Sequence, residues 1–133
     1  MSRFCFSKII ENPNGAESDV EDLLGYNLSA WMAIGVVGYD DPLNTYFINM
    51  EDGWIFGTTD HEIPSIHHLQ RVIAALFRGA LIPFSEEGLR EISVGVESFL
   101  AVLSPEQASA ESNQVSAEYL SSQVEIANFY RNQ

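Results

Sequence analysis

The sequence predicts an α+β fold: a small antiparallel β-meander of about four strands, with helices packed on one face and a helical C-terminus. Three short apolar runs separated by acidic turns, at 31–39, 45–50 and 54–59, have the length and spacing of neighbouring strands. After them, residues 65–79 repeat apolar side chains at the three-and-four spacing of one helical face. A chain of 133 residues with 46% hydrophobic content fits one packed domain.

Local turn and capping signals predict the elements around this centre. Residues 4–10 alternate apolar side chains and are expected to form a first strand. Ser18 and Glu21 have the spacing of a capping box, which predicts a short helix that ends at Gly25. Ser65 is expected to cap the 65–79 helix in the same way.

A second long helix is predicted at 86–103, with Ser85 as its N-cap. Gly88 and Gly95 weaken this helix by about 1 kcal/mol each relative to Ala, so a β-strand at 92–96 remains an alternative. The apolar positions of the helix are expected to face the core: Leu89, Ile92, Val96, Phe99, Leu100 and Leu103.

The composition changes after residue 103 and predicts three regions. Residues 1–103 are expected to form a single compact α+β domain. Residues 104–114 are rich in Ser, Glu and Gln and are expected to be a flexible linker. Residues 115–133 are expected to form a C-terminal helix that docks on the domain or on a partner.

Negative charge is the unusual property of this composition. Nineteen acidic residues against six Lys and Arg give a formal net charge of −13 at pH 7. Residues 9–70 contain no Lys or Arg but eleven of the acids. This charge disfavours direct binding to nucleic acid, which needs cations to displace counterions, and to anionic membranes. The longest apolar run also falls far short of the about 20 residues that a membrane helix needs.

The N-terminal residues and the cysteine content predict a cytoplasmic protein. The N-terminal sequence lacks the basic leader and apolar segment of a secretory signal. Cys5 is the one cysteine, so no internal disulfide can form, and a reducing compartment is expected.

Catalytic and metal-binding motifs are not apparent, and we expect no enzymatic activity and no cofactor. The segment from Asp60 to His68 contains the residue types of a metal site, but His67 and His68 are adjacent on a helix and point about 100° apart. An enzyme or metal site around Asp60–His68 is therefore kept as an alternative only. Cys5 lies in an apolar run and is expected to be a buried small hydrophobic side chain rather than a nucleophile.

The acidic turns predict a binding surface for a basic protein, as carboxylates beside aromatic side chains steer and anchor such partners. The expected partner-binding residues are Asp40, Asp41, Glu51, Asp52, Asp60, Glu62, Tyr39, Tyr46 and Trp54. The predicted function is a non-enzymatic inhibitor, of the immunity-protein or phage-inhibitor type. It would neutralise a toxin or a nucleic-acid-processing enzyme, and nucleic-acid mimicry is one way to do so.

Two simpler interpretations of the same residues remain open. The acidic half could be only a solvated face that keeps the chain soluble. The chain could instead be an acidic secretion-type chaperone, a dimer that holds an effector segment along an exposed apolar sheet. Either a monomer or a homodimer is compatible with the sequence.

Overall fold

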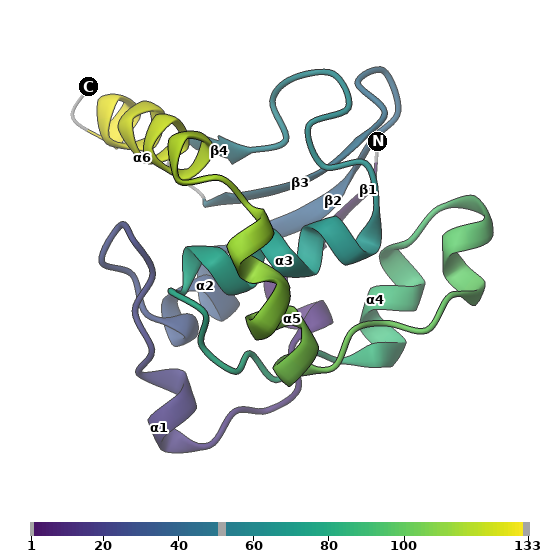
Figure 1. Ribbon diagram of the computed structural model, residues 1–133, viewed down its shortest axis with the longest axis horizontal. Helices are drawn as coiled ribbons and strands as arrows, with labels where there is room; N and C mark the ends of the chain where they lie inside the picture. Colours follow the sequence, from purple (N-terminus) through teal and green to yellow (C-terminus); the bar gives the residue numbers. More distant parts are fainter. Residues whose placement is uncertain (1, 51–52, 132–133) are drawn as a thin grey trace.

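The computed structural model describes residues 2–50 and 53–131 and has an α+β architecture (Figure 1). Its antiparallel sheet has the strand order β1-β2-β3-β4. The strands are β1 (Ser2–Cys5), β2 (Val36–Asp40), β3 (Thr45–Met50) and β4 (Gly53–Phe56). The longer helices are α2 (Leu28–Ile34), α3 (Ile66–Leu76), α4 (Glu86–Ile92), α5 (Pro105–Glu111) and α6 (Ala117–Arg131). The predicted fold class and the helical C-terminus are confirmed.

The helices α2, α3 and α5 lie on one side of the sheet, whereas α6 runs beside β4 (Figure 1). All six residues of β3 are buried. Tyr46 and Ile48 belong to the main hydrophobic core, and Phe47, on the alternate face of the strand, is also fully buried. The predicted helix at 65–79 is confirmed as α3, and Ser65 caps it by accepting the His68 amide at 3.1 Å. Its buried face includes Leu69, Val72 and Ile73.

The first predicted strand of the meander, 31–39, is wrong in its first half. Residues Leu28–Ile34 form α2, because the Asn27 side chain accepts the Ala30 amide at 2.8 Å and caps a helix there. Trp31 is fully buried against Phe6, and its indole donates to the buried Asp22 carboxylate at 2.5 Å. The strand begins only at Val36, after α2 has ended.

The N-terminal predictions also need correction. The strand expected at 4–10 covers only Ser2–Cys5, and Phe6–Ile9 form a 3-10 turn, η1, that places Phe6 and Ile9 in the core. Cys5, expected to be buried, is exposed, because it alternates with the less exposed Phe4 along β1. The helix expected to follow Ser18 is replaced by α1 (Gly15–Ser18), which is capped by Asn14.

The Asp22 carboxylate explains why no helix follows Ser18. Its Oδ1 accepts the amides of Leu24 and Tyr26, both at 2.8 Å, and this holds the chain in a turn.

The long helix expected at 86–103 is broken. The helix α4 ends at Ile92, and the chain turns at Gly95, whose φ of +59° is favoured by glycine, into the 3-10 turn η2 (Gly95–Phe99). The predicted strand alternative at 92–96 is not formed either. Leu89, Ile92 and Leu103 are buried as expected, but Val96, Phe99 and Leu100 are exposed.

The segment expected to be a flexible linker, 104–114, is helical. It forms α5 and the 3-10 turn η3 (Ser112–Gln114), and Ser104 and Gln107 make a capping box at the start of α5. Ala108 is fully buried, and Arg71 of α3 is paired with Glu111 of α5 at 2.8 Å. These contacts pack 104–114 against α3.

Within residues 2–50 and 53–131, none of the helices combines the length and apolar character needed to cross a membrane.

Candidate functional site

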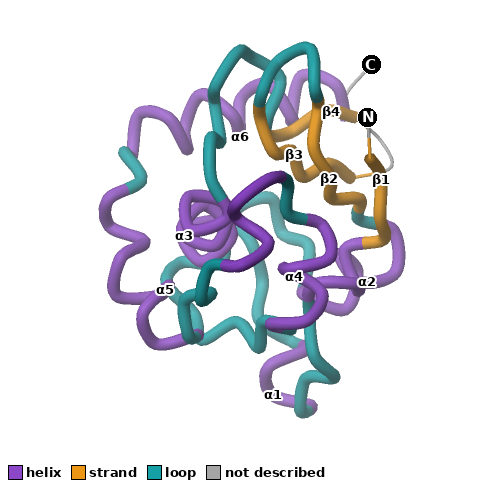
Figure 2. Tube along the Cα trace, turned by 90° about the vertical axis from the view of Figure 1, so that its right-hand side faces the viewer, coloured by secondary structure: helices purple, strands orange, loops and turns teal. Residues whose placement is uncertain are grey.

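Two acidic loops lie side by side at one end of the sheet (Figure 2). The turn 41–44 joins β2 to β3, and the loop 57–65 joins β4 to α3. The amide of His61 donates to the carbonyl oxygen of Leu43 at 2.9 Å. The amide of Tyr46 donates to the carbonyl oxygen of Ile63, also at 2.9 Å. The loops expose Asp41 and Asp60, and the Asp60 side chain is 72% exposed. Asp41 and Asp60, both predicted to bind a partner, therefore lie on neighbouring loops.

Two other predicted carboxylates stabilise these loops from within. Asp40 is only 6% exposed, and its Oδ1 accepts the Leu43 amide at 3.3 Å. Glu62 accepts the amides of Gly57, Thr58 and Thr59 at 2.7, 3.1 and 3.2 Å. Asp40 and Glu62 therefore hold backbone amides in place instead of presenting charge to a partner.

Glu51 and Asp52 lie outside the described residues.

The predicted aromatic residues also separate into different environments. Tyr46 is fully buried, so it cannot contact a partner in this structure. Tyr39 is half-buried, with its ring centroid 4.9 Å from that of Tyr46. The side chain of Trp54 is outside the described part of the molecule.

Tyr46 has a structural role, because it fixes the 3-10 turn η2. Its hydroxyl donates to Oε1 of Glu97 at 2.9 Å and accepts the Val94 amide at 3.1 Å. The other carboxylate oxygen of Glu97 accepts the amide of Ile66, the first residue of α3, at 2.8 Å. Burial raises the pKa of Tyr46 well above 10.0; the hydrogen bond to Glu97 adds to this rise and the Val94 amide opposes it.

The turn η2 exposes apolar side chains beside the acidic loops. Phe99 is 87% exposed, Val96 is 79% exposed and Leu100 is 46% exposed. The exposure of these residues was not predicted, because the long helix expected at 86–103 would turn all three inward. Gly95 was the signal that could have revealed them, since a helix that stops there frees the next residues from the helical spacing.

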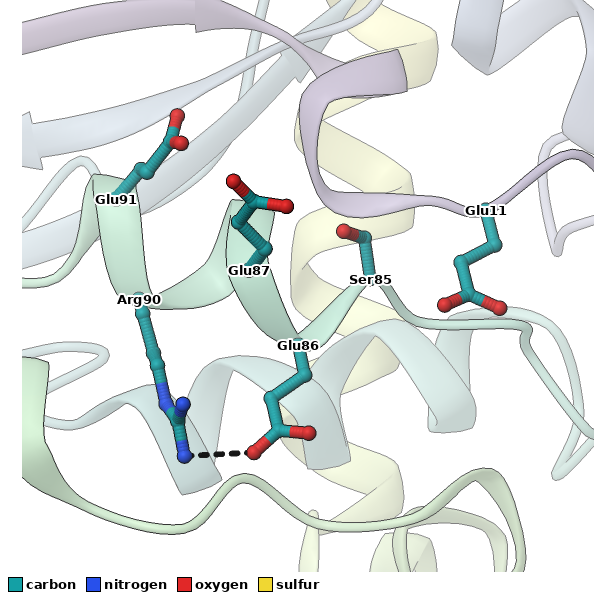
Figure 3. Close-up of a pocket in the computed structure, with 6 residues that line it drawn as sticks. All are labelled: Glu11, Ser85, Glu86, Glu87, Arg90 and Glu91. Carbon is teal, nitrogen blue, oxygen red and sulfur yellow. Dashed lines mark ion pairs between the residues drawn. The ribbon is translucent and has the colours of Figure 1, made fainter.

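A shallow acidic pocket of about 480 Å³ lies along α4, and Figure 3 shows the residues that line it. Arg90 pairs with Glu86 at 2.6 Å, and Lys8 pairs with Glu91, whose hydrogen bond raises the pKa of Lys8. The lining residues are Glu11, Ser85, Glu86, Glu87, Arg90 and Glu91. Four carboxylates against Arg90 and the neighbouring Lys8 leave this pocket negatively charged.

The turn η2 lies between these two acidic regions. In Figure 1 it is the green turn at the right-hand edge, below the loops that carry Asp41 and Asp60 and above α4. Figure 2 faces this side of the molecule and shows the same vertical order. We call this side the η2 face and define it by the loops that carry Asp41 and Asp60, the turn η2 with Val96 and Phe99, and α4.

The histidines and the carboxylates near them do not form a metal site among the described residues. His67 Nε2 lies 2.8 Å from the carbonyl oxygen of Ala101. Burial, and then the charge of Arg71, lower the pKa of His68. His61 is 64% exposed and lies 3.4 Å from Asp60. In the described part of the chain, no three His, Cys, Asp or Glu side chains are arranged to hold a metal ion.

The secretion-chaperone alternative requires an apolar sheet surface that is open to a peptide. β3 is buried along its whole length, and Val37 and Gly38 of β2 are buried as well. The most exposed large apolar side chain that the structure describes is instead Phe99 in η2.

The chain shows no significant match to any known protein family, curated protein or solved structure.

Proposed function

We propose that this chain is a non-enzymatic acidic protein that binds and neutralises a basic protein partner, such as a toxin or a nucleic-acid-processing enzyme. One observation carries the proposal: the exposed carboxylates of Asp41 and Asp60 lie on loops joined by the His61–Leu43 hydrogen bond. The helix α4, whose carboxylates line the acidic pocket, lies below these loops on the side of the molecule that Figure 2 faces.

The physical basis is electrostatic attraction over long range. A net charge of −13 attracts a cationic surface and raises the rate of encounter. A nuclease or another nucleic-acid-processing enzyme has such a surface, since it must bind phosphates. Carboxylates on the η2 face would occupy the positions that phosphates take when such an enzyme binds nucleic acid.

The test uses two variants with the same change in net charge. Asp41→Asn/Asp60→Asn neutralises two exposed carboxylates of the η2 face, whereas Glu118→Gln/Glu125→Gln neutralises two exposed carboxylates of α6. Wild type and both variants are used as bait in a lysate of the native host, and captured proteins are quantified by mass spectrometry. The proposal expects a basic protein whose capture is lost with the first variant and kept with the second.

The association rate of that protein is then measured as a function of salt. Screening reduces electrostatic attraction, so the rate for wild type is expected to fall by about tenfold or more between low and high ionic strength. The rate for Asp41→Asn/Asp60→Asn should depend less on salt. Equal capture by both variants, or an association rate that salt does not change, would reject the proposed function.

A further inference from the structure

The η2 turn carries a small apolar patch on a strongly acidic molecule. Phe99 and Val96 are 87% and 79% exposed, and Leu100 is 46% exposed. Single exposed apolar side chains are common on proteins, but three of them within five residues of one turn are typical of an interaction site.

The turn that carries this patch is held rigidly. The Glu97 carboxylate lies within η2 and binds both the Tyr46 hydroxyl and the Ile66 amide. Ser98 Oγ donates to the Gly95 carbonyl oxygen at 2.9 Å. Because these contacts fix the backbone before any partner arrives, little conformational entropy is lost when Phe99 is buried in an interface.

The charges around η2 specify what can cover it. The loops that carry Asp41 and Asp60 lie on one side of the turn, and α4, which carries Glu86, Glu87 and Glu91, lies on the other (Figure 2). Acidic surfaces repel this face, including those of anionic membranes and of a second copy in the same orientation. A surface that fits it has an apolar pocket at its centre and Lys or Arg around the rim.

We infer that Phe99, supported by Val96, is the apolar anchor that inserts into a pocket bordered by Lys or Arg on the basic protein partner. The inference rests on the proposed function and adds the contact that determines affinity. Buried aromatic residues at the centre of an interface commonly contribute most of the binding free energy, and the surrounding charges contribute mainly to the encounter rate.

The test uses short random peptides displayed on phage as the probe, selected against immobilised wild-type protein at physiological ionic strength. The enriched peptides are expected to combine Lys or Arg with an aromatic or aliphatic residue. Phe99→Ala should weaken their binding by about tenfold or more. Phe129→Ala removes another exposed aromatic ring, 62% exposed on α6, and should leave their affinity unchanged.

The outcomes separate the anchor from the proposed function. A selection that yields no peptide sensitive to Phe99→Ala overturns the anchor. If Asp41→Asn/Asp60→Asn weakens peptide binding while Phe99→Ala does not, the acidic surface stands without the anchor. If Phe99→Ala weakens it and Asp41→Asn/Asp60→Asn does not, the recognition of basic groups is rejected.

Two further measurements address other occupants of this face. Dimerisation in sedimentation equilibrium that Phe99→Ala abolishes would assign the patch to a second copy and overturn the inference. Binding to zwitterionic lipid vesicles that Phe99→Ala abolishes would assign it to a lipid surface, with the same consequence. A monomer that ignores vesicles agrees with the inference.

Discussion

The hydroxyl of Tyr46 donates a 2.9 Å hydrogen bond to the carboxylate of Glu97, which joins two residues 51 positions apart in the chain. The same two side chains bind the amides of Val94 and Ile66. One buried tyrosine in β3 therefore positions both the η2 turn and the start of α3. The geometry of the η2 face depends on this pair, although Tyr46 is itself fully buried.

Tyr46→Phe is expected to reduce the free energy of unfolding by about 1–3 kcal/mol, because it leaves the Val94 amide and Glu97 each without one hydrogen-bond partner. Glu97→Gln should cost a similar amount, since its amide group would face donors. Urea unfolding should show a lower midpoint with an unchanged slope for each variant.

The double variant distinguishes a coupled pair from two independent residues. Its loss of stability should fall short of the sum of the single losses by at least about 0.5 kcal/mol. Strictly additive losses would show that the two side chains act separately. Glu125→Gln, an exposed residue of α6, is the charge-matched control for Glu97→Gln.

Alkaline pH is expected to destabilise the protein through Tyr46 and Tyr119. Burial raises the pKa of both hydroxyls above 10.0, and hydrogen bonds to Glu97 and Glu62 raise them further. A raised pKa in the folded state means that the unfolded chain loses its proton first. Stability is therefore complete below about pH 10 and falls as the pH rises above it, by at most about 1.4 kcal/mol per pH unit for each tyrosine.

Urea unfolding between pH 8 and pH 11 measures this slope. The variant Tyr46→Phe/Tyr119→Phe should be less stable at neutral pH but should lose less stability above about pH 10. The same slope in wild type and variant would contradict the assignment to these two residues.

The parts of the fold that the sequence predicts well are those where one local signal acts alone. Ser65 and the apolar stripe that follows it define α3. The run at 31–39 is compatible with a strand or a helix, since its residues are apolar on both faces. The Asn27 cap and the burial of Trp31 against Asp22 decide for a helix there. The Asp22 contact spans nine residues and is not visible in a local pattern.

The candidate site is predictable only in part, for a related reason. The acidic composition correctly indicates exposed carboxylates at Asp41 and Asp60. It cannot distinguish these from Asp40 and Glu62, whose carboxylates accept backbone amides. Phe99 is exposed because the helix breaks at Gly95. The apolar spacing of an unbroken helix predicts instead that Phe99 faces the core.

Gly88→Ala is expected to destabilise the protein, although alanine is the better helix former. A Cβ atom at Gly88 would lie 1.8 Å from the carbonyl oxygen of Lys8, so α4 or η1 would have to move. We expect a loss of about 2 kcal/mol or more, as for other overpacked sites. Gly15→Ala is the matched control, because nothing lies within 4 Å of a Cβ atom there, and it should be neutral or slightly stabilising.

Thermal unfolding of the two glycine variants compares them directly. A Gly88→Ala protein as stable as wild type would show that the packing of α4 on η1 tolerates a shift. Its effect would then be set by helix propensity, as the sequence alone suggests.

Glu62→Gln is expected to loosen both the 57–59 segment and α6. The Glu62 carboxylate accepts three backbone amides of that segment, the Thr59 hydroxyl and the Tyr119 hydroxyl of α6. A glutamine has one acceptor oxygen in place of two, and its NH2 group would face these donors. Hydrogen exchange followed by mass spectrometry should show less protection in 57–59 and α6, while α3 remains protected.

Tyr119→Phe separates the two effects. It removes the contact between α6 and Glu62 but leaves the amides of Gly57, Thr58 and Thr59 bound to the carboxylate. Protection should then fall in α6 and persist in 57–59. The ring of Tyr119 still packs on Phe56, with centroids 5.9 Å apart, so α6 should remain docked on β4. Equal protection of α6 in wild type and in both variants would show that this packing alone holds the C-terminal helix.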